Sequence, residues 1–153
     1  LEAAHHHIHL EYYIYEDVAS GKSIAEILIR KAKEGVEVRF MYDDFGSHGL
    51  SKTFIKTLEA AGVQTAPFYK IKLIALANRL NYRNHRKIIA IDGKTSFVGG
   101  INISDKYRND SLGNPDLFWR DTHLMLYGPA TAHLQYLFLC YWNFCSKYGL
   151  SQF

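Results

Sequence analysis

The spacing of hydrophobic residues predicts a strand and then a helix at the start of the chain. Residues 7–15 alternate between polar and apolar and are rich in Ile, Leu and Tyr, as in a half-buried strand. Ser23 then opens a capping-box sequence, although Ser20 is also suited to cap a longer helix. Apolar residues at helical spacing follow, and they end at Gly35, which is a typical helix stop.

The same alternation of strand and helix continues as far as residue 69. Residues 36–42 are a hydrophobic run with strand composition, and Ser51 begins a second helix that ends near Gly62. Residues 63–69 form a short extended segment that contains a proline. The apolar residues of 70–81 fit either a helical turn or an irregular loop.

The second half of the chain predicts a hairpin, a strand and a final helix. Residues 86–91 and 95–98 alternate on either side of a tight turn, and a polar loop separates them from a strand at 122–127. Pro129 suits the first turn of a helix, whose apolar face comprises Leu134, Leu137, Phe138, Tyr141, Trp142 and Cys145. This order predicts one domain, residues 1–153, of the α/β class, with a mixed, mostly parallel sheet sandwiched by helices.

The hairpin carries the candidate chemistry. Because strand side chains alternate, His85 and Lys87 point to the same face. Asp92-Gly93 is a turn sequence whose residues both tolerate positive φ. Gly99-Gly100 removes side chains where the backbone bends or a ligand comes close, and Asn102 follows with an amide that can donate to an anion. An imidazole, an ammonium group and an amide in this arrangement suit a phosphate.

The spacing of these residues resembles the signature of the phospholipase D superfamily. That signature is His-x-Lys, four residues, Asp, six residues, Gly-Gly-x-Asn, and His85 to Asn102 match it position by position. The segments 9–14, 35–44, 81–87 and 119–124 further resemble bacterial cardiolipin synthases. The resemblance runs over nearly the whole chain and implies the first of two catalytic halves, without a membrane-spanning start. Gly100 is a departure, because other members of the superfamily often have Ser there.

The resemblance implies a role for each motif residue. His85 is the nucleophile that forms a phosphohistidine, Lys87 supplies positive charge, and Asn102 donates a hydrogen bond to the phosphate oxygens. Gly99 and Gly100 border the phosphate. No metal or cofactor is implied, because these donors neutralise the phosphate themselves.

A downstream carboxylate is expected to orient the nucleophilic imidazole, since an acceptor on its second nitrogen fixes the tautomer. Asp121 is the leading candidate for this role towards His85, and Glu11 and Asp116 are weaker ones. Asp92 belongs to the same motif, but it lies at the turn, away from the face of His85, so a structural role is favoured over direct catalysis.

Several other polar residues have a structural interpretation beside a functional one. Arg86 points away from His85, so it and Arg83 are of less interest as phosphate ligands. Alternation places His5, His7 and His9 on one face, where a metal site is conceivable, but a structural strand is favoured. Asp43-Asp44 is treated as a loop rather than a metal pair.

Composition narrows the function classes only slightly. The 153 residues are 48% hydrophobic and 22% charged, which is ordinary for one globular domain. The net charge of +3 is compatible with anionic headgroups or nucleic acid and proves neither. Two cysteines exclude a disulfide framework, and no apolar run reaches the roughly 18 residues of a membrane span. The chain begins at Leu1, so we expect a piece of a longer protein that is itself soluble.

The function that the resemblance implies is a phosphatidyltransferase that condenses two phosphatidylglycerol molecules to cardiolipin and glycerol. One alternative is a phosphodiesterase of the same superfamily that acts on nucleic acid or phospholipid, with nucleic acid the less favoured substrate. A second alternative is a non-catalytic half that needs a partner. The family mechanism uses two imidazoles, so a second half in cis or a homodimer mate is expected. The parent protein is expected at the bacterial cell membrane, with this domain on the membrane surface.

Overall fold

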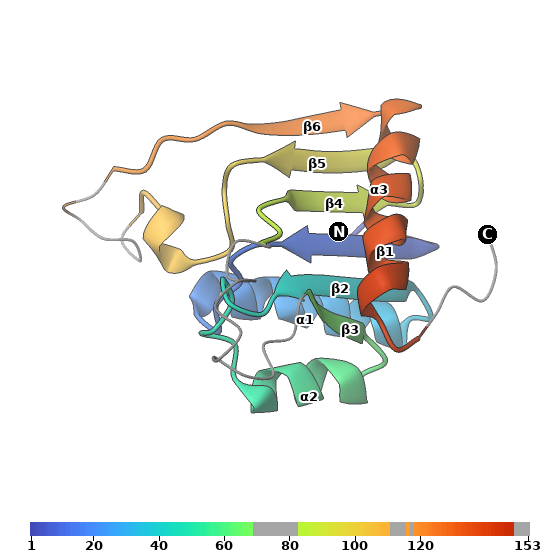
Figure 1. Cartoon of the computed structure of the whole chain (residues 1–153), viewed down its shortest axis with the longest axis horizontal. Helices are drawn as coiled ribbons and strands as arrows, with labels where there is room; N and C mark the ends of the chain where they lie inside the picture. The colour runs from blue at the N-terminus through green and yellow to red at the C-terminus, as the bar shows by residue number, and fades with distance from the viewer. Residues whose placement is uncertain (69–82, 111–115, 117, 149–153) are drawn as a thin grey trace.

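A computed structural model describes residues 1–68, 83–110, 116 and 118–148 (Figure 1). Its strands are β1 (His7–Tyr12), β2 (Glu37–Asp43), β3 (Gln64–Phe68), β4 (Lys87–Ile91), β5 (Thr95–Gly99) and β6 (His123–Tyr127). Its helices are α1 (Ala19–Lys33), α2 (Lys52–Ala60), α3 (Ala130–Cys145) and the short 3-10 helix η2 (Asp105–Tyr107). The undecided segment 70–81 lies outside the described residues.

The six strands form one sheet in the order β3-β2-β1-β4-β5-β6. β1 pairs with β2 and β2 with β3 in parallel, whereas β4, β5 and β6 join the sheet through antiparallel pairs. The predicted α/β fold with a mixed sheet is therefore confirmed. The expectation that the sheet is mostly parallel is wrong, because the hairpin strands β4 and β5 and the final strand β6 all join it through antiparallel pairs. The β4–β5 hairpin lies beside β1 because Leu10 pairs with Ile89 and Ile89 with Phe97.

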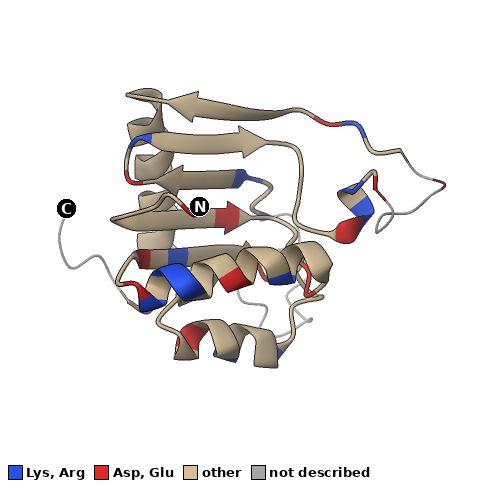
Figure 2. Cartoon of the chain, turned by 180° about the vertical axis from the view of Figure 1, so that it is seen from behind, with Lys and Arg blue, Asp and Glu red and all other residues tan. Residues whose placement is uncertain are grey.

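Two hydrophobic clusters fill the two faces of the sheet. Behind the sheet, α1 and α2 cover apolar residues of β1 and β2, with Leu10, Leu28 and Phe40 fully buried. In front of it, α3 packs through Phe138 and Trp142, which are also fully buried. Figure 2 shows that no helix of the described residues covers the rear of β4, β5 and β6. The strands of the hairpin are thus supported on one face and uncovered on the other.

The first helix begins earlier than the capping box at Ser23 predicts. α1 starts at Ala19, and its first backbone N–H groups have no cap from the preceding side chain. The carboxylate of Asp105 accepts hydrogen bonds from the N–H groups of Ala19 (3.0 Å) and Ser20 (2.9 Å) instead. A residue 85 positions away therefore accepts hydrogen bonds from the free backbone N–H groups at the start of this helix. No local pattern carries that information. The predicted start at Ser23 is wrong, and the alternative of a longer helix is closer, although its N-cap residue is Val18 and not Ser20.

The other predicted boundaries are close to the observed ones. Ser51 caps α2 by accepting from Phe54 N, and Gly35 and Gly62 have positive φ just after α1 and α2. Asp92 (φ 52°) and Gly93 (φ 65°) make the tight turn between β4 and β5. The predicted face of the last helix is confirmed at Phe138 and Trp142, and its other members are only partly buried. Within the described residues, no helix is long and apolar enough to cross a membrane.

Candidate active site

His85 and Lys87 meet at the ring of Tyr13, at the start of β4. The imidazole of exposed His85 stacks on Tyr13 with ring centroids 3.8 Å apart and planes at 18°. The Lys87 ammonium lies 5.3 Å from the centroid of the same Tyr13 ring, and it donates a 2.6 Å hydrogen bond to the His85 carbonyl oxygen. The two groups therefore converge, as alternation along the strand predicts. Tyr13 was not predicted, because a Tyr in a strand of apolar residues carries no distinguishing signal.

Asn102 reaches the same region from the chain that follows β5. Its Oδ1 accepts from the N–H of Ile14 (3.1 Å), which is next to Tyr13 in sequence, and its Nδ2 donates to the hydroxyl of Tyr107 (2.8 Å). The side chain is largely buried, at 9% exposure. An amide nitrogen carries two hydrogens, so one N–H of Asn102 is left for a ligand. Tyr107 is a second residue that sequence reasoning missed.

The two glycines admit a neighbouring segment of the chain. A Cβ at Gly99 would lie 2.4 Å from the carbonyl oxygen of Thr122, and a Cβ at Gly100 would lie 2.2 Å from Asp121 Oδ1. The N–H of Gly100 donates to the Thr122 carbonyl at 3.0 Å. The missing side chains thus let the start of β6 approach β5, which brings the exposed Asp121 to the site. Whether a phosphate also approaches Gly99 and Gly100 stays a prediction.

Asp121 acts on the site through charge. Burial lowers the pKa of the Lys87 ammonium below its usual value, and the carboxylate of Asp121 opposes that shift. Burial likewise lowers the pKa of His123, with Asp121 again in opposition. Asp121 accepts a hydrogen bond from Thr122 N (2.7 Å). No bond joins it to His85 among the described residues, so its role in orienting the imidazole stays a prediction.

Asp92 lies at the far end of β4, where its side chain makes hydrogen bonds to the backbone. Its carboxylate accepts from the backbone N–H groups of His5 (2.9 Å), His6 (2.8 Å) and His7 (2.9 Å). Partial burial acts to raise its pKa, but these three bonds outweigh burial and leave the pKa lowered. The geometry fits the structural role favoured for Asp92, which joins the hairpin turn to the start of β1.

Two other acidic candidates contact the segment around His85 from the opposite face of the sheet. Glu11 is fully buried, and its Oε1 accepts from Asn84 and Arg86 rather than from the His85 ring. Asp43 caps the loop after β2 and also accepts from the N–H of Asn84 at 3.0 Å. Arg86 points away from His85, as predicted, and its guanidinium lies over the ring of Tyr141 on α3.

The histidines at the start of β1 stack and do not converge on one point. The rings of His7 and His9 are 4.6 Å apart, and His9 stacks in turn on Phe138 at 4.7 Å. His7 Nε2 bonds to Gln135 on α3. Among the described residues, no group of three His, Cys, Asp or Glu side chains is placed to hold a metal ion. Of the remaining candidates, Asp116 is exposed and Arg83 lies over the ring of Phe45.

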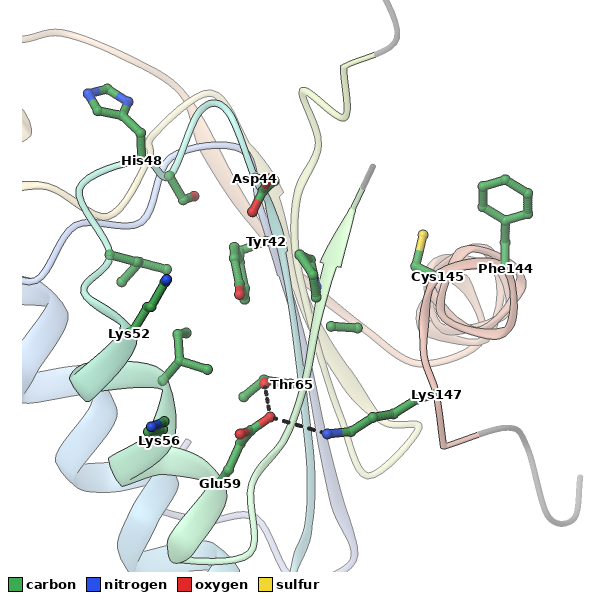
Figure 3. A pocket seen from close by; sticks show the side chains of 15 residues that line it. Tyr42, Asp44, His48, Lys52, Lys56, Glu59, Thr65, Phe144, Cys145 and Lys147 are labelled. Carbon is green, nitrogen blue, oxygen red and sulfur yellow. Dashed lines mark hydrogen bonds and ion pairs between the residues drawn. The ribbon is translucent and has the colours of Figure 1, made fainter. Parts of the chain in front are cut away.

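An apolar pocket of about 360 Å³ adjoins Asn102 on the uncovered rear face of β4 and β5. Its apolar walls are Ile24, Ile89, Phe97, Ile101 and Ile103, and its polar rim includes Asn102 and His123. A second cavity of about 910 Å³ lies between α2 and α3 at the β3 edge (Figure 3). Its walls carry Lys52, Lys56 and Lys147, with Lys147 paired to Glu59, and none of the predicted site residues lines it.

Comparison with known proteins gives the family. Residues 1–122 match the family model described as "Cardiolipin synthase, PLD-like domain". The chain belongs to the cardiolipin synthase PLD-like domains. The matched residues contain His85, Lys87, Asp92, Asn102 and Asp121, so the whole candidate site lies inside this PLD-like domain.

Relatives of this PLD-like domain are much longer than the chain. The chain is 52% identical over 144 residues to cardiolipin synthase 2 of Bacillus cereus. The aligned region covers 93% of this chain and 27% of the relative. It is 47% identical over 150 residues to the major cardiolipin synthase of Bacillus subtilis, with 97% and 30% covered. The fold is similar to that of Nuc, a phospholipase D family member from Salmonella typhimurium, with a TM-score of 0.66 at 16% identity, over 97% of this chain and 86% of Nuc. The chain spans less than a third of these synthases.

Proposed function

We propose that this PLD-like domain supplies one catalytic half of a phosphatidyltransferase that makes cardiolipin and glycerol from two molecules of phosphatidylglycerol. The observation that carries the proposal is the meeting of His85 and Lys87 at the ring of Tyr13, with Asn102 bonded to the backbone N–H of the next residue. His85 is exposed, so its ring is open to a substrate. Lys87 is buried to 8% exposure, where its charge acts on a phosphate with little screening.

Two displacements at phosphorus complete the reaction. In the first, an imidazole nitrogen of His85 bonds to phosphorus of the donor, and the bond from phosphorus to the oxygen of the headgroup glycerol breaks. The leaving alkoxide takes a proton from a second imidazole. In the second, the free hydroxyl of another phosphatidylglycerol gives its proton to that imidazole and attacks phosphorus, and the phosphorus–nitrogen bond breaks. Lys87 and Asn102 stabilise the charge on the non-bridging oxygens in both displacements.

A lipid is favoured over nucleic acid by the surroundings of the site. The apolar pocket beside Asn102 has walls of isoleucine and phenylalanine, which suit the non-polar part of a lipid. A nucleic acid would instead be expected to follow a long basic groove. The relatives named cardiolipin synthase support the same choice, since they are about half identical to this chain.

The second imidazole is proposed to come from another half, in cis in the parent protein or from a homodimer mate. The relatives extend well beyond the length of this chain, which leaves room for such a half. The uncovered rear of β4–β6 adjoins Lys87 and exposes Met125 (64%) and Tyr127 (78%). A surface of this kind suits a partner domain. The parent protein is proposed to act at the bacterial cell membrane, where its lipid substrate lies.

Trapping of the phosphohistidine tests the proposal. The chain, alone and with its second half, is incubated with phosphatidylglycerol that carries radiolabelled phosphate, and the quenched protein is analysed for label. Label is expected on His85, absent in His85→Ala and retained in His7→Ala, because His7 lies at the far end of β1. Release of phosphatidic acid would mean that water is the acceptor and would make the protein a hydrolase. No label in either preparation would remove the transferase proposal.

A further inference from the structure

Glu11 is a fully buried carboxyl group that lies behind the catalytic residue. It lies near the end of β1, has 0% exposure, and faces α3, whereas His85 faces Tyr13 on the other side of the sheet. Its Oε1 accepts from Asn84 Nδ2 and from Arg86 Nε, the latter at 2.9 Å. The residues immediately before and after His85 are thus held by one oxygen atom.

Further contacts complete the attachment of this segment. Asn84 Oδ1 accepts from the N–H of Arg86 (3.2 Å), so its amide bridges across His85. The N–H of Asn84 donates to Asp43 Oδ2 (3.0 Å), and the Arg86 guanidinium lies 3.7 Å from the centroid of the Tyr141 ring. Side chains from β1, β2 and α3 therefore fix the backbone on both sides of the histidine.

We propose that Glu11 is a positioning residue for the phosphoryl transfer, which holds residues 84–86 so that the His85 imidazole lies on Tyr13 beside Lys87. The inference rests on the function proposed above for His85. Glu11 touches neither the imidazole nor any position that a phosphate at Lys87 would occupy. It acts through the backbone, since small misplacements of a nucleophile cost large factors in rate.

Stability alone does not explain a carboxyl group at this position. Glu11 Oε2 is buried and has no hydrogen-bond partner among the described residues. Burial raises the pKa of Glu11, and Asn84 and Arg86 oppose that shift only in part. Apolar residues of similar size in place of both members of a buried ion pair are often neutral or stabilising, so the pair of Glu11 with Arg86 is weak evidence of a role in stability. A carboxyl oxygen that orients Asn84 and Arg86 gives this residue a role that packing does not.

The test compares Glu11→Leu with Glu11→Gln and with His9→Leu as a matched control. Glutamine keeps the oxygen that accepts from Asn84 and Arg86. His9 lies two residues earlier on the same face of β1 and is 2% exposed, and its buried ring nitrogens also lack hydrogen-bond partners within the described residues. Both leucine variants therefore remove a buried polar group from one strand face. Only Glu11→Leu releases residues 84–86.

Three readouts are taken on each variant: the melting temperature, the NMR signals of the His85 ring assigned by comparison with His85→Ala, and the rate of phosphohistidine labelling with the second half present. We expect Glu11→Leu to shift the His85 signals and to lower the labelling rate at least about tenfold. Glu11→Gln and His9→Leu should leave the His85 signals unshifted and keep the labelling rate within about twofold of the wild type. This difference separates a positioning role from general destabilisation.

Unshifted His85 signals in folded Glu11→Leu would overturn the proposal, and so would an equal shift in His9→Leu. If Glu11→Leu does not fold, Glu11→Asp takes its place, because its carboxyl is one methylene too short to reach Asn84. It should shift the His85 signals in the same way, and unshifted signals overturn the proposal equally. If the wild type takes no label, the transferase function fails, and the NMR comparison still decides whether Glu11 positions His85.

Discussion

The two ends of β4 carry residues of one motif in opposite chemical states. At its start, the His85 ring has no hydrogen bond among the described residues, and Lys87 is a buried charge with a lowered pKa. At its end, the Asp92 carboxylate accepts three backbone N–H groups. A polar group whose bonds are all made within the fold stabilises the fold, whereas a group left incompletely paired is free to bind a ligand. One strand thus separates the part of the motif that we propose to be reactive from its structural part.

The largest expected effect concerns catalysis at the start of β4. Lys87→Met should lower the rate of phosphohistidine formation about 10²- to 10³-fold, because it removes a charge directed at the developing phosphate charge. The rate is measured by quenched labelling from phosphatidylglycerol with the second half present. Lys94→Met is the matched control, since it makes the same change at an exposed position in the hairpin turn. Equal loss in both variants would contradict a special role for Lys87.

The next effect concerns stability at the other end of the strand. Asp92→Ala leaves the N–H groups of residues 5–7 without their acceptor and places Ala at positive φ, so it should lower the free energy of unfolding by about 2 to 3 kcal/mol. Urea unfolding monitored by circular dichroism measures the change. Asp121→Ala is the control, because exposed Asp121 makes one backbone hydrogen bond and should cost less than about 1 kcal/mol.

The same carboxylate gives stability a defined pH dependence. The folded pKa of Asp92 is lowered, so its contribution is complete above the unfolded pKa of about 3.9 and is lost as the pH falls through the folded pKa. Asp92→Asn removes this titration. The stability difference between wild type and Asp92→Asn should therefore shrink below about pH 4. A difference that is constant from pH 7 to pH 3 would mean that the three amides do not favour the ionised form.

The glycine pair gives a smaller contrast of the same kind. Gly99→Ala would place a Cβ 2.4 Å from the Thr122 carbonyl oxygen and 2.6 Å from His123 Cα, both of them backbone atoms, and should cost about 2 kcal/mol. Gly100→Ala meets the Asp121 carboxylate, which is exposed and can turn away, so it should cost about 1 kcal/mol or less. Urea unfolding of both variants measures the order, and the reverse order would contradict the contacts.

The sequence predicts those parts of the fold and site that depend on short spacing. The period of two places His85 and Lys87 on one face, and Asp92-Gly93 predicts the turn that the structure contains. Neither depends on distant parts of the chain. The strand segments are predicted for the same reason, since each carries its own alternation or its own apolar, strand-like composition.

Most of the features that the sequence does not predict join distant segments. Asp105 caps α1 across 85 positions, Glu11 holds Asn84 across 73, and Tyr13 meets His85 only because β1 lies beside β4. A buried carboxyl and an exposed one look alike in a sequence, so the sequence alone offers both Glu11 and Asp121 as partners of one imidazole. The sheet order argues against Glu11, because it places this residue on the face opposite to His85, and it leaves the role of Asp121 a prediction.

The smallest effect is the most direct test of the contrast between the two ends of β4. Burial lowers the pKa of Lys87, so the protonated side chain opposes folding at neutral pH, and that cost is relieved as the pH rises through the folded pKa towards the unfolded value of about 10.4. Lys87→Met removes the cost but also the bond to the His85 carbonyl. Its free energy of unfolding at pH 7 should equal that of the wild type or exceed it by up to about 1 kcal/mol, and the advantage should shrink towards pH 10. Urea unfolding at both pH values measures this. A clear loss of stability in Lys87→Met at pH 7 would mean that Lys87, like Asp92, stabilises the fold, and the distinction between a reactive end and a structural end of this strand would be lost.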